Sequence, residues 1–252
     1  GTITRWQFNN AGDEEELLEI KQWGNFESNG AYTDEFNGAS NLTIANAIDW
    51  PNMNSCPSMR DFFLRCSSLT SIPNAQKWDT SNVTSMANTF NQCTNFNSNI
   101  DSWDTSNVTS FAAAFSNAQS FNQPLNNWDV SNGIFQSMFS NAQSFNQDLN
   151  NWDISSATNL GSMFFSADNF NGDLSNWDVS GVTTMFSMFE DCFNFEGKGL
   201  ETWNPSSCTD FFECFRDVSG SFNPDISGWD VSSGTRFQYM FLNAPGFNRN
   251  LG

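Results

Sequence analysis

Apolar residues recur along this chain with a regular period, and polar residues fill the same places between them in each copy. Successive copies of a Phe-x-x-small motif are separated by 24 residues (Phe115 to Phe139) to 28 residues (Phe8 to Phe36). The phenylalanines of this motif are Phe8, Phe36, Phe63, Phe90, Phe115, Phe139, Phe164, Phe189, Phe215 and Phe241. A period of this size is typical of solenoids, propellers and arrays, in which each unit buries its apolar face against its neighbours.

Within one copy the apolar spacing predicts one helix and one short strand. Residues three to four apart form a helical stripe, as at Val182, Met185, Met188, Phe189 and Cys192. Trp177 and Val179 alternate as on a strand, and the Asp-Val-Ser-Gly segment that begins at Asp178 is typical of a helix N-cap. We therefore expect an α/β fold, a right-handed solenoid of the leucine-rich-repeat type. It would hold nine to ten repeats, each with a parallel-sheet strand and a helix.

The repeat predicts a single solenoid domain over residues 1–252. We expect residues 1–24 to be an irregular capping repeat, residues 25–77 to hold longer repeats without Trp-Asp, and residues 78–252 to hold the Trp-Asp repeats. The array stops part-way through a repeat, which suggests a longer protein. Residues 13–24 allow a capped helix between Asp13 and Gly24. The register of the repeat instead places Leu18 and Ile20 on the strand side, and we favour this second interpretation.

Charge and composition narrow the function classes. The chain has 28 acidic and 9 basic residues, so its surface should repel nucleic acid and anionic membranes. Histidine is absent, which removes the commonest general base and histidine-ligated zinc, and we expect no enzyme. The sequence has no run of about 18 or more apolar residues and no signal-peptide pattern at its start, so we expect no direct membrane insertion by this part of the protein.

Six cysteines are present, most of them at apolar positions of the repeat. We interpret them as buried free thiols. The alternative is a disulfide between adjacent copies, such as Cys66 with Cys93, which requires Cα atoms less than about 7 Å apart.

Two longer segments carry a resemblance to a known family. These are WDTSNVTSMANTFNQCTNFN (78–97) and WDVSGVTTMFSMFEDCFNF (177–195), and FNGASNLTI (36–44) and LRCSSLTSIP (64–73) show a second repeat form. The pattern resembles the BspA-like leucine-rich-repeat surface proteins of bacteria, whose repeat is about 26 residues long. That resemblance implies a secreted or cell-surface protein that binds protein, extracellular matrix or polysaccharide in adhesion, with no catalytic repeat residues. The chain departs from the pattern at Gly133, Asn204 and Gly234.

Equivalent positions of successive copies form columns. We interpret the Trp column as core, with an aromatic platform for sugars as the alternative, and the Phe and Met columns as core. An Asn column at Asn97, Asn122, Asn146, Asn171, Asn223 and Asn248 predicts a ladder in which each amide bonds the backbone of the next turn.

The aspartates of Trp-Asp form a candidate acidic ladder, made of Asp79, Asp104, Asp129, Asp153, Asp178 and Asp230. Each is expected to cap a helix or turn, because the bond to a free amide offsets the repulsion between neighbouring carboxylates. Asn204 in the place of one aspartate favours hydrogen bonding over charge as the role of this column. The alternative is a Ca²⁺ ion that damps the charge, although no EF-hand or GGxGxD pattern is present. No other cofactor is expected.

The remaining candidate for ligand binding is a polar row between the Leu and Trp columns, on the outward side of the predicted strand. It consists of Ser102, Asn126, Asn127, Asn150, Asn151, Ser175, Asn176, Glu201, Thr202, Ser227 and Gly228. We predict a non-enzymatic surface protein that binds a macromolecule through this row. The alternatives are a solvated face on a stalk or spacer, a polysaccharide-active enzyme and an ice-binding protein.

Overall fold

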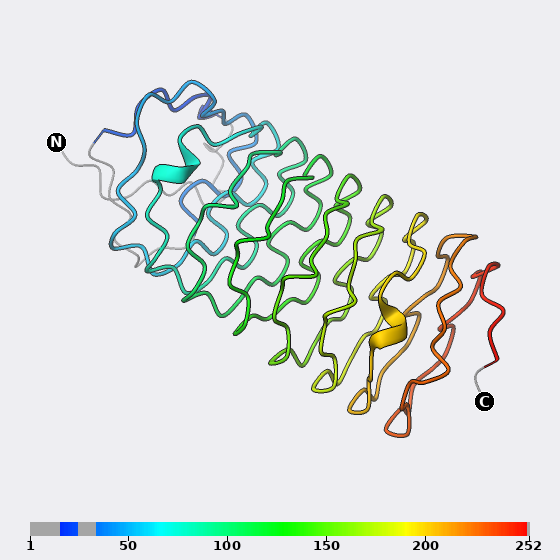
Figure 1. Ribbon diagram of the computed structural model, residues 1–252. Coiled ribbons are helices and arrows are strands. Elements are labelled where there is room, and N and C mark those ends of the chain that lie inside the picture. The colour runs from blue at the N-terminus through cyan, green and yellow to red at the C-terminus, as the bar shows by residue number, and fades with distance from the viewer. Residues whose placement is uncertain (1–15, 25–33, 251–252) are drawn as a thin grey trace.

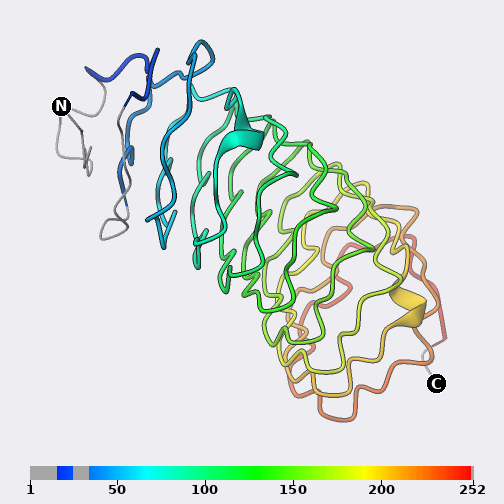
Figure 2. The ribbon, with the colours of Figure 1, turned by 60° about the vertical axis from the view of Figure 1, so that its left-hand side comes forward.

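The computed structural model describes residues 16–24 and 34–250, and these residues form an elongated stack of similar turns (Figure 1). Turned by 60°, the same turns follow one another as roughly parallel loops along the stack (Figure 2). The named elements are two short 3₁₀ segments, η2 (Ala75–Lys77) and η3 (Leu200–Thr202). None of the described residues belongs to a helix long and apolar enough to cross a membrane.

The predicted α/β leucine-rich-repeat fold is wrong. The β pairing in the described chain is limited to isolated parallel bridges, such as Ser85 with Ser110 and Thr184 with Asp210. These bridges lie after the buried Val position and not at the Leu and Trp columns, where strands were expected. A bridge one residue wide is not a sheet strand, so the turns are held together by other contacts.

The predicted helix of each copy is instead a pair of consecutive β-turns. In residues 135–142, the N–H of Met138 donates to the carbonyl of Phe135 at 3.0 Å, and the N–H of Ala142 donates to the carbonyl of Phe139 at 3.0 Å. Both bonds span three residues, whereas an α-helix requires bonds that span four. The four residues follow the spacing i, i+3, i+4, i+7 of a helix face. That pattern therefore fits the corners of two turns as well as it fits a helix.

Left-handed backbone conformations distinguish the two turns from a helix. The third residue of each turn has a positive φ, 57° at Ser137 and 58° at Asn141. A positive φ at this place is a feature of type II turns, and Gly, Asn and Asp adopt it most readily. The position before the small residue is occupied by Gly38, Arg65, Gln92, Asn117, Asn141, Ser166, Asp191, Asp217 and Asn243, all with positive φ. Most of these residues are polar or Gly, and that column is the sequence signal for turns.

Backbone groups of the double turn bond to the neighbouring copies. The N–H of Phe139 donates to the carbonyl of Met163 at 2.8 Å, and the N–H of Asn141 donates to the carbonyl of Phe165 at 2.6 Å. Alternate peptides therefore point along the stack, with each N–H toward the following turn and each C=O toward the preceding one. A single copy would lose all of these bonds, so each turn needs its neighbours to satisfy its backbone.

The Phe column forms a continuous stack of rings inside the molecule, as predicted. Phe139 is fully buried, and its ring centroid lies 5.6 Å from that of Phe115 and 5.7 Å from that of Phe164. The same ring stacks on Phe145 of its own turn at 4.0 Å. The core is therefore a column shared between turns, in which a ring such as that of Phe139 contacts the copies on both sides.

The Trp column is also buried, so the alternative of an aromatic platform for sugars is wrong. Trp128 is 4% exposed, and its indole N–H donates to the carbonyl of Ile100 in the preceding turn at 3.1 Å. Trp152 makes the equivalent bond to Leu125 at 2.9 Å. These bonds satisfy the one polar atom of a buried indole, and they link turns at the edge where a sheet had been expected.

The start of the described chain continues the stack. Ile20 donates its N–H to the carbonyl of Thr43 at 2.9 Å, and Thr43 donates to the carbonyl of Leu18 at 2.9 Å, on either side of a parallel bridge at Glu19. Residues 17–24 are not helical, which agrees with the interpretation by register, although Leu18 is 63% exposed. The rest of the predicted cap, residues 1–15, and residues 25–33 of the longer repeats lie outside the described residues.

Candidate functional site

The polar row lies in turns and not on strands. In each described copy the residues between the Leu and Trp columns form a tight turn, closed for example by the bond from the N–H of Trp152 to the carbonyl of Leu149 at 3.0 Å. In the turn that ends at Trp203 the segment is η3. Most of the predicted ligand-facing residues are exposed there, while Asn150 and Ser175 are half-buried. The row is therefore accessible, but its geometry is that of successive turn tips.

About half of the row is already bonded within the protein. Asn127 donates its backbone N–H and its Nδ2 group to the carboxylate of Asp101, at 2.9 and 2.7 Å. Asn150 accepts the backbone N–H of Asn176 at 2.7 Å, and the hydroxyl of Thr202 donates to the carbonyl of Ser175 at 2.8 Å. These residues join adjacent turns.

Four members of the polar row keep their side chains open. Their side chains are exposed and form no hydrogen bond within the described chain; they are Ser102, Asn126, Asn151 and Glu201. They are the part of the row that a ligand can contact without breaking a bond of the scaffold.

Each aspartate of the acidic ladder is exposed, and its carboxylate binds the residue two positions later. Asp104 accepts the N–H and the hydroxyl of Ser106 at 3.0 and 2.7 Å, and Asp178 accepts the N–H of Ser180 at 3.0 Å. This closes an Asx-turn. The expected capping bond is therefore present, but it stabilises a turn and not a helix. Asn204, in the place of one aspartate, makes no such bond in the described structure.

Hydrogen bonding outweighs charge repulsion along the ladder. Bonds from Ser180 lower the pKa of Asp178 below its ordinary value, and the opposing repulsion from Asp153 is a smaller effect. Bonds from the serine two residues on lower the pKa of Asp104 and Asp230 in the same way. No group of three or more metal-ligating His, Cys, Asp or Glu side chains lies together in the described residues. Within the described residues, the acidic ladder therefore forms no cluster of carboxylates that could bind Ca²⁺.

The Asn column forms the predicted ladder. The Oδ1 atom of Asn122 accepts the backbone N–H of Asn146 at 3.0 Å, and Oδ1 of Asn146 accepts that of Asn171 at 2.8 Å. Asn171 continues the series by accepting the N–H of Glu196 at 3.0 Å. Each carboxamide oxygen is therefore used to join one turn to the next.

A polar groove runs along this ladder, and the sequence did not indicate it. It has a volume of about 550 Å³, and we call it the asparagine groove; it is lined by Asn122, Ser144, Asn146, Asn169, Asn171, Asn194 and Glu196. In the sequence, a buried phenylalanine stands between the residue on one side of the groove and the residue on the other, as Phe170 stands between Asn169 and Asn171. The signal was an Asn or Ser two residues before each ladder position of the groove, on the far side of the phenylalanine.

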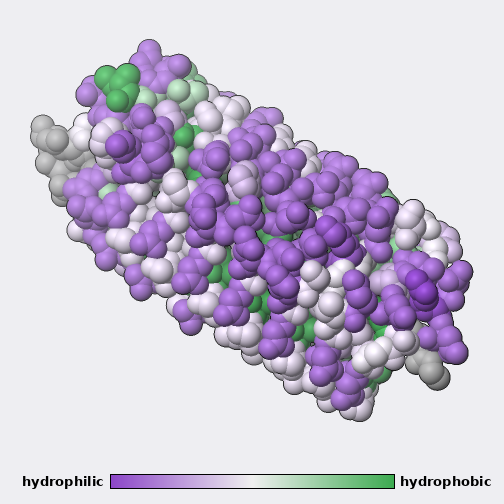
Figure 3. Space-filling view, in the orientation of Figure 1, coloured by the Kyte–Doolittle hydropathy of each residue, from purple (hydrophilic) through white to green (hydrophobic). Residues whose placement is uncertain are grey.

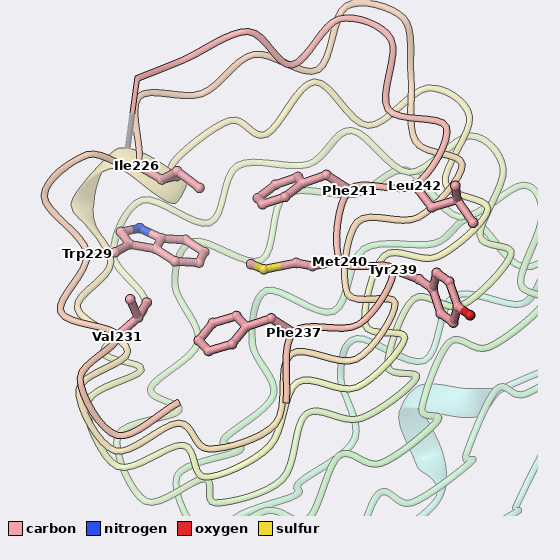
Figure 4. Close-up of a pocket in the computed structure, with 8 residues that line it drawn as sticks. All are labelled: Ile226, Trp229, Val231, Phe237, Tyr239, Met240, Phe241 and Leu242. Atoms are coloured by element: carbon pink, nitrogen blue, oxygen red, sulfur yellow. The ribbon is translucent and has the colours of Figure 1, made fainter. Parts of the chain in front are cut away.

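An apolar pocket of about 530 Å³ lies at the end of the described stack (Figure 4). Trp229, Phe237, Met240 and Phe241 point toward its interior, while Tyr239 points away from it. Trp229 belongs to the Trp column and Phe241 to the Phe column. In the middle of the stack, the residues of these columns are covered by the following turn. The pocket is therefore the uncovered end of the core.

All six cysteines are free and buried, as interpreted from the sequence, and the alternative of a disulfide between Cys66 and Cys93 is wrong. The thiol of Cys93 contacts the carbonyl of Phe63 at 2.9 Å. Burial raises the pKa of Cys66, Cys93 and Cys192 well above the usual range for a thiol. These groups stay protonated at neutral pH and fill space in the core.

The repeat matches one known protein family. Residues 32–134, 57–176, 133–218 and 159–252 each match the family described as Mycoplasma protein of unknown function, DUF285. The chain belongs to this family. Four overlapping matches agree with a repeat that continues through the stack, and they do not confirm the finer resemblance to BspA-like leucine-rich-repeat proteins. No curated protein matches the sequence.

Proposed function

We propose that the protein is a non-enzymatic, extracellular or cell-surface repeat protein that binds another macromolecule in adhesion. The observation that carries this proposal is the repeated presentation of open polar side chains at equivalent turn tips, as at Asn126 and Asn151. On the face shown in Figure 3, hydrophilic side chains predominate along the stack. A ligand with its own repeat could contact several turns at once, which increases affinity without any single strong contact.

The chemistry of the side chains supports binding over catalysis. The chain has no histidine, and the protonated thiols of the core are poor nucleophiles. The acidic ladder repeats one local bond in every turn and does not gather carboxylates into a single site. The partners we propose are a protein, extracellular matrix or a polysaccharide. Nucleic acid is disfavoured because the chain carries a formal net charge of −19.

A binding array with two variants tests this function. The purified protein is applied to immobilised matrix proteins and glycans, beside Asn126→Ala/Asn151→Ala and the control Asn132→Ala, which alters an exposed asparagine outside the polar row. We expect binding to at least one class of ligand and a loss of roughly 30-fold in the double variant, since two hydrogen bonds contribute about 1 kcal/mol each. The control should bind as the parent does. Binding to nothing on the array would contradict the proposal and favour a stalk or spacer.

A further inference from the structure

The carboxamides of the asparagine groove are turned so that each offers one kind of hydrogen-bonding group. In Asn122, Asn146 and Asn171 the Oδ1 atom is occupied by the backbone of the following turn. Their Nδ2 groups have no acceptor in the described structure. Each of these residues therefore presents an NH₂ group with two donors, and one such group recurs in three consecutive turns along the groove.

The opposite side of the groove adds acceptors and a hydroxyl. Asn169 and Asn194 use their Nδ2 groups on the carbonyls of Gln143 and Asp168, at 2.9 and 3.0 Å. The Oδ1 atom of Asn194 is left as an open acceptor, and Ser144 contributes a hydroxyl without a partner in the described residues. A ligand in the groove must accept hydrogen bonds from the Nδ2 groups on one side, and it can donate a hydrogen bond to the Oδ1 atom of Asn194 on the other side.

Charge decides which ligands suit this arrangement. An anionic chain could accept from the NH₂ row, but Glu196 lies at one end of the groove and the whole protein has a formal net charge of −19. The groove lining has no basic or apolar side chain that would attract a phosphate or an apolar peptide. Hydroxyl groups of an uncharged sugar both donate and accept, so they match both sides.

We propose that the asparagine groove binds an uncharged polysaccharide chain, laid along the stack so that successive sugars meet successive turns. This inference goes beyond the proposed function, because it assigns a second binding surface beside the polar row and names the ligand class of that surface. The groove is about 550 Å³ in volume and crosses several copies, so a chain and not a single sugar fills it. The repeat of the ligand then matches the repeat of the protein.

The test uses two asparagine-to-aspartate changes that leave the ladder bonds intact. Asn146→Asp/Asn171→Asp keeps the oxygen that accepts the N–H of the next turn and removes two NH₂ groups. The matched control, Asn132→Asp/Asn204→Asp, introduces the same charge at two exposed asparagines that lie outside both the groove lining and the polar row. Binding is measured by retention on cellulose, chitin and mannan, with the anionic polysaccharide alginate for comparison. Thermal melts verify that each variant is folded.

We expect the parent and the control to bind at least one neutral polysaccharide equally, and the groove variant to bind it at least tenfold more weakly. Retention of binding in the groove variant would overturn the proposal, as would binding to alginate alone or to none of the polysaccharides. Retained binding in the groove variant, together with a loss in the Asn126→Ala/Asn151→Ala variant, would place the ligand on the polar row; that result rejects the groove but leaves the proposed function standing.

A second measurement does not depend on the variants folding. Side-chain amide signals of the parent protein are followed by NMR while a soluble oligosaccharide of the retained polysaccharide is added. The Nδ2 signals of Asn122, Asn146 and Asn171 should shift, and those of Asn126 and Asn151 should not. The reverse pattern contradicts the groove proposal.

Discussion

Replacing Phe139 by alanine is expected to lower the free energy of unfolding by about 3 to 5 kcal/mol. The ring is fully buried and stacks on Phe115, Phe145 and Phe164, in its own turn and both neighbours. Removing it opens a cavity between three turns whose backbones are fixed by bonds along the stack, so little collapse can fill the space. Urea denaturation measures the loss, and a change in the slope of the transition would indicate that part of the stack unfolds separately.

The matched variant is Phe241→Ala in the last complete double turn of the described chain. Phe241 occupies the same column but is only partly buried, and it packs on Phe215 and Phe247 without a following turn. We expect a loss of about half the size. Equal losses in the two variants would show that the core is not shared between successive turns.

Replacing Gly199 by alanine is expected to cost about 3 kcal/mol, the second largest effect. Gly199 precedes η3 and has φ 93° and ψ −10°, a region that is unfavourable for residues with a side chain. An added Cβ would also lie against the backbone nitrogen of Ser175 and 2.7 Å from the carbonyl carbon of Leu174 in the preceding turn. Because both contacts are with backbone, the two turns would have to separate to relieve them.

Gly228→Ala is the control, since a Cβ there meets nothing within 4 Å and its φ is not positive. We expect this change to alter the free energy of unfolding by less than about 1 kcal/mol. Thermal and urea unfolding of the two variants give the comparison. A Gly199→Ala protein as stable as the Gly228→Ala protein would mean that adjacent turns are not in close backbone contact at this point.

The period alone was enough to predict which residues are buried. Trp128, Phe139 and Cys93 are inside because each stands at a column that recurs in every copy, whatever local structure the copy adopts. The Asn ladder was predictable for a similar reason, since one amide per turn at a constant place can reach the same place in the next turn.

Local structure was not predictable from apolar spacing, because the double turn and the helix share the same i, i+3, i+4, i+7 pattern. The residues that could have separated them are Asn117, Asn141 and Asp191, which stand one position before the small residue and adopt positive φ. Asn and Asp are tolerated in a helix, so these residues in a single copy do not distinguish a double turn from a helix. Their recurrence at a single column favours turns.

The candidate sites were predicted unevenly. The bond that the backbone N–H of Ser180 donates to Asp178 follows from side-chain chemistry, so it was foreseen even though the helix that Asp178 was expected to cap is absent. The asparagine groove was missed because Asn146 had been given a structural role. Only the direction of its carboxamide shows that the oxygen is used by the scaffold while the NH₂ group is not.

The ¹³Cα chemical shifts of residues 135–142, assigned by NMR in solution, test the central claim most directly. A stack of double turns predicts that the shifts alternate, because φ is positive at Ser137 and again at Asn141 but not at the turn residues between them. Bonds from Phe139 to Met163 should also protect the Phe139 amide from hydrogen exchange. An unbroken run of helical shifts from Phe135 to Ala142 would contradict the account.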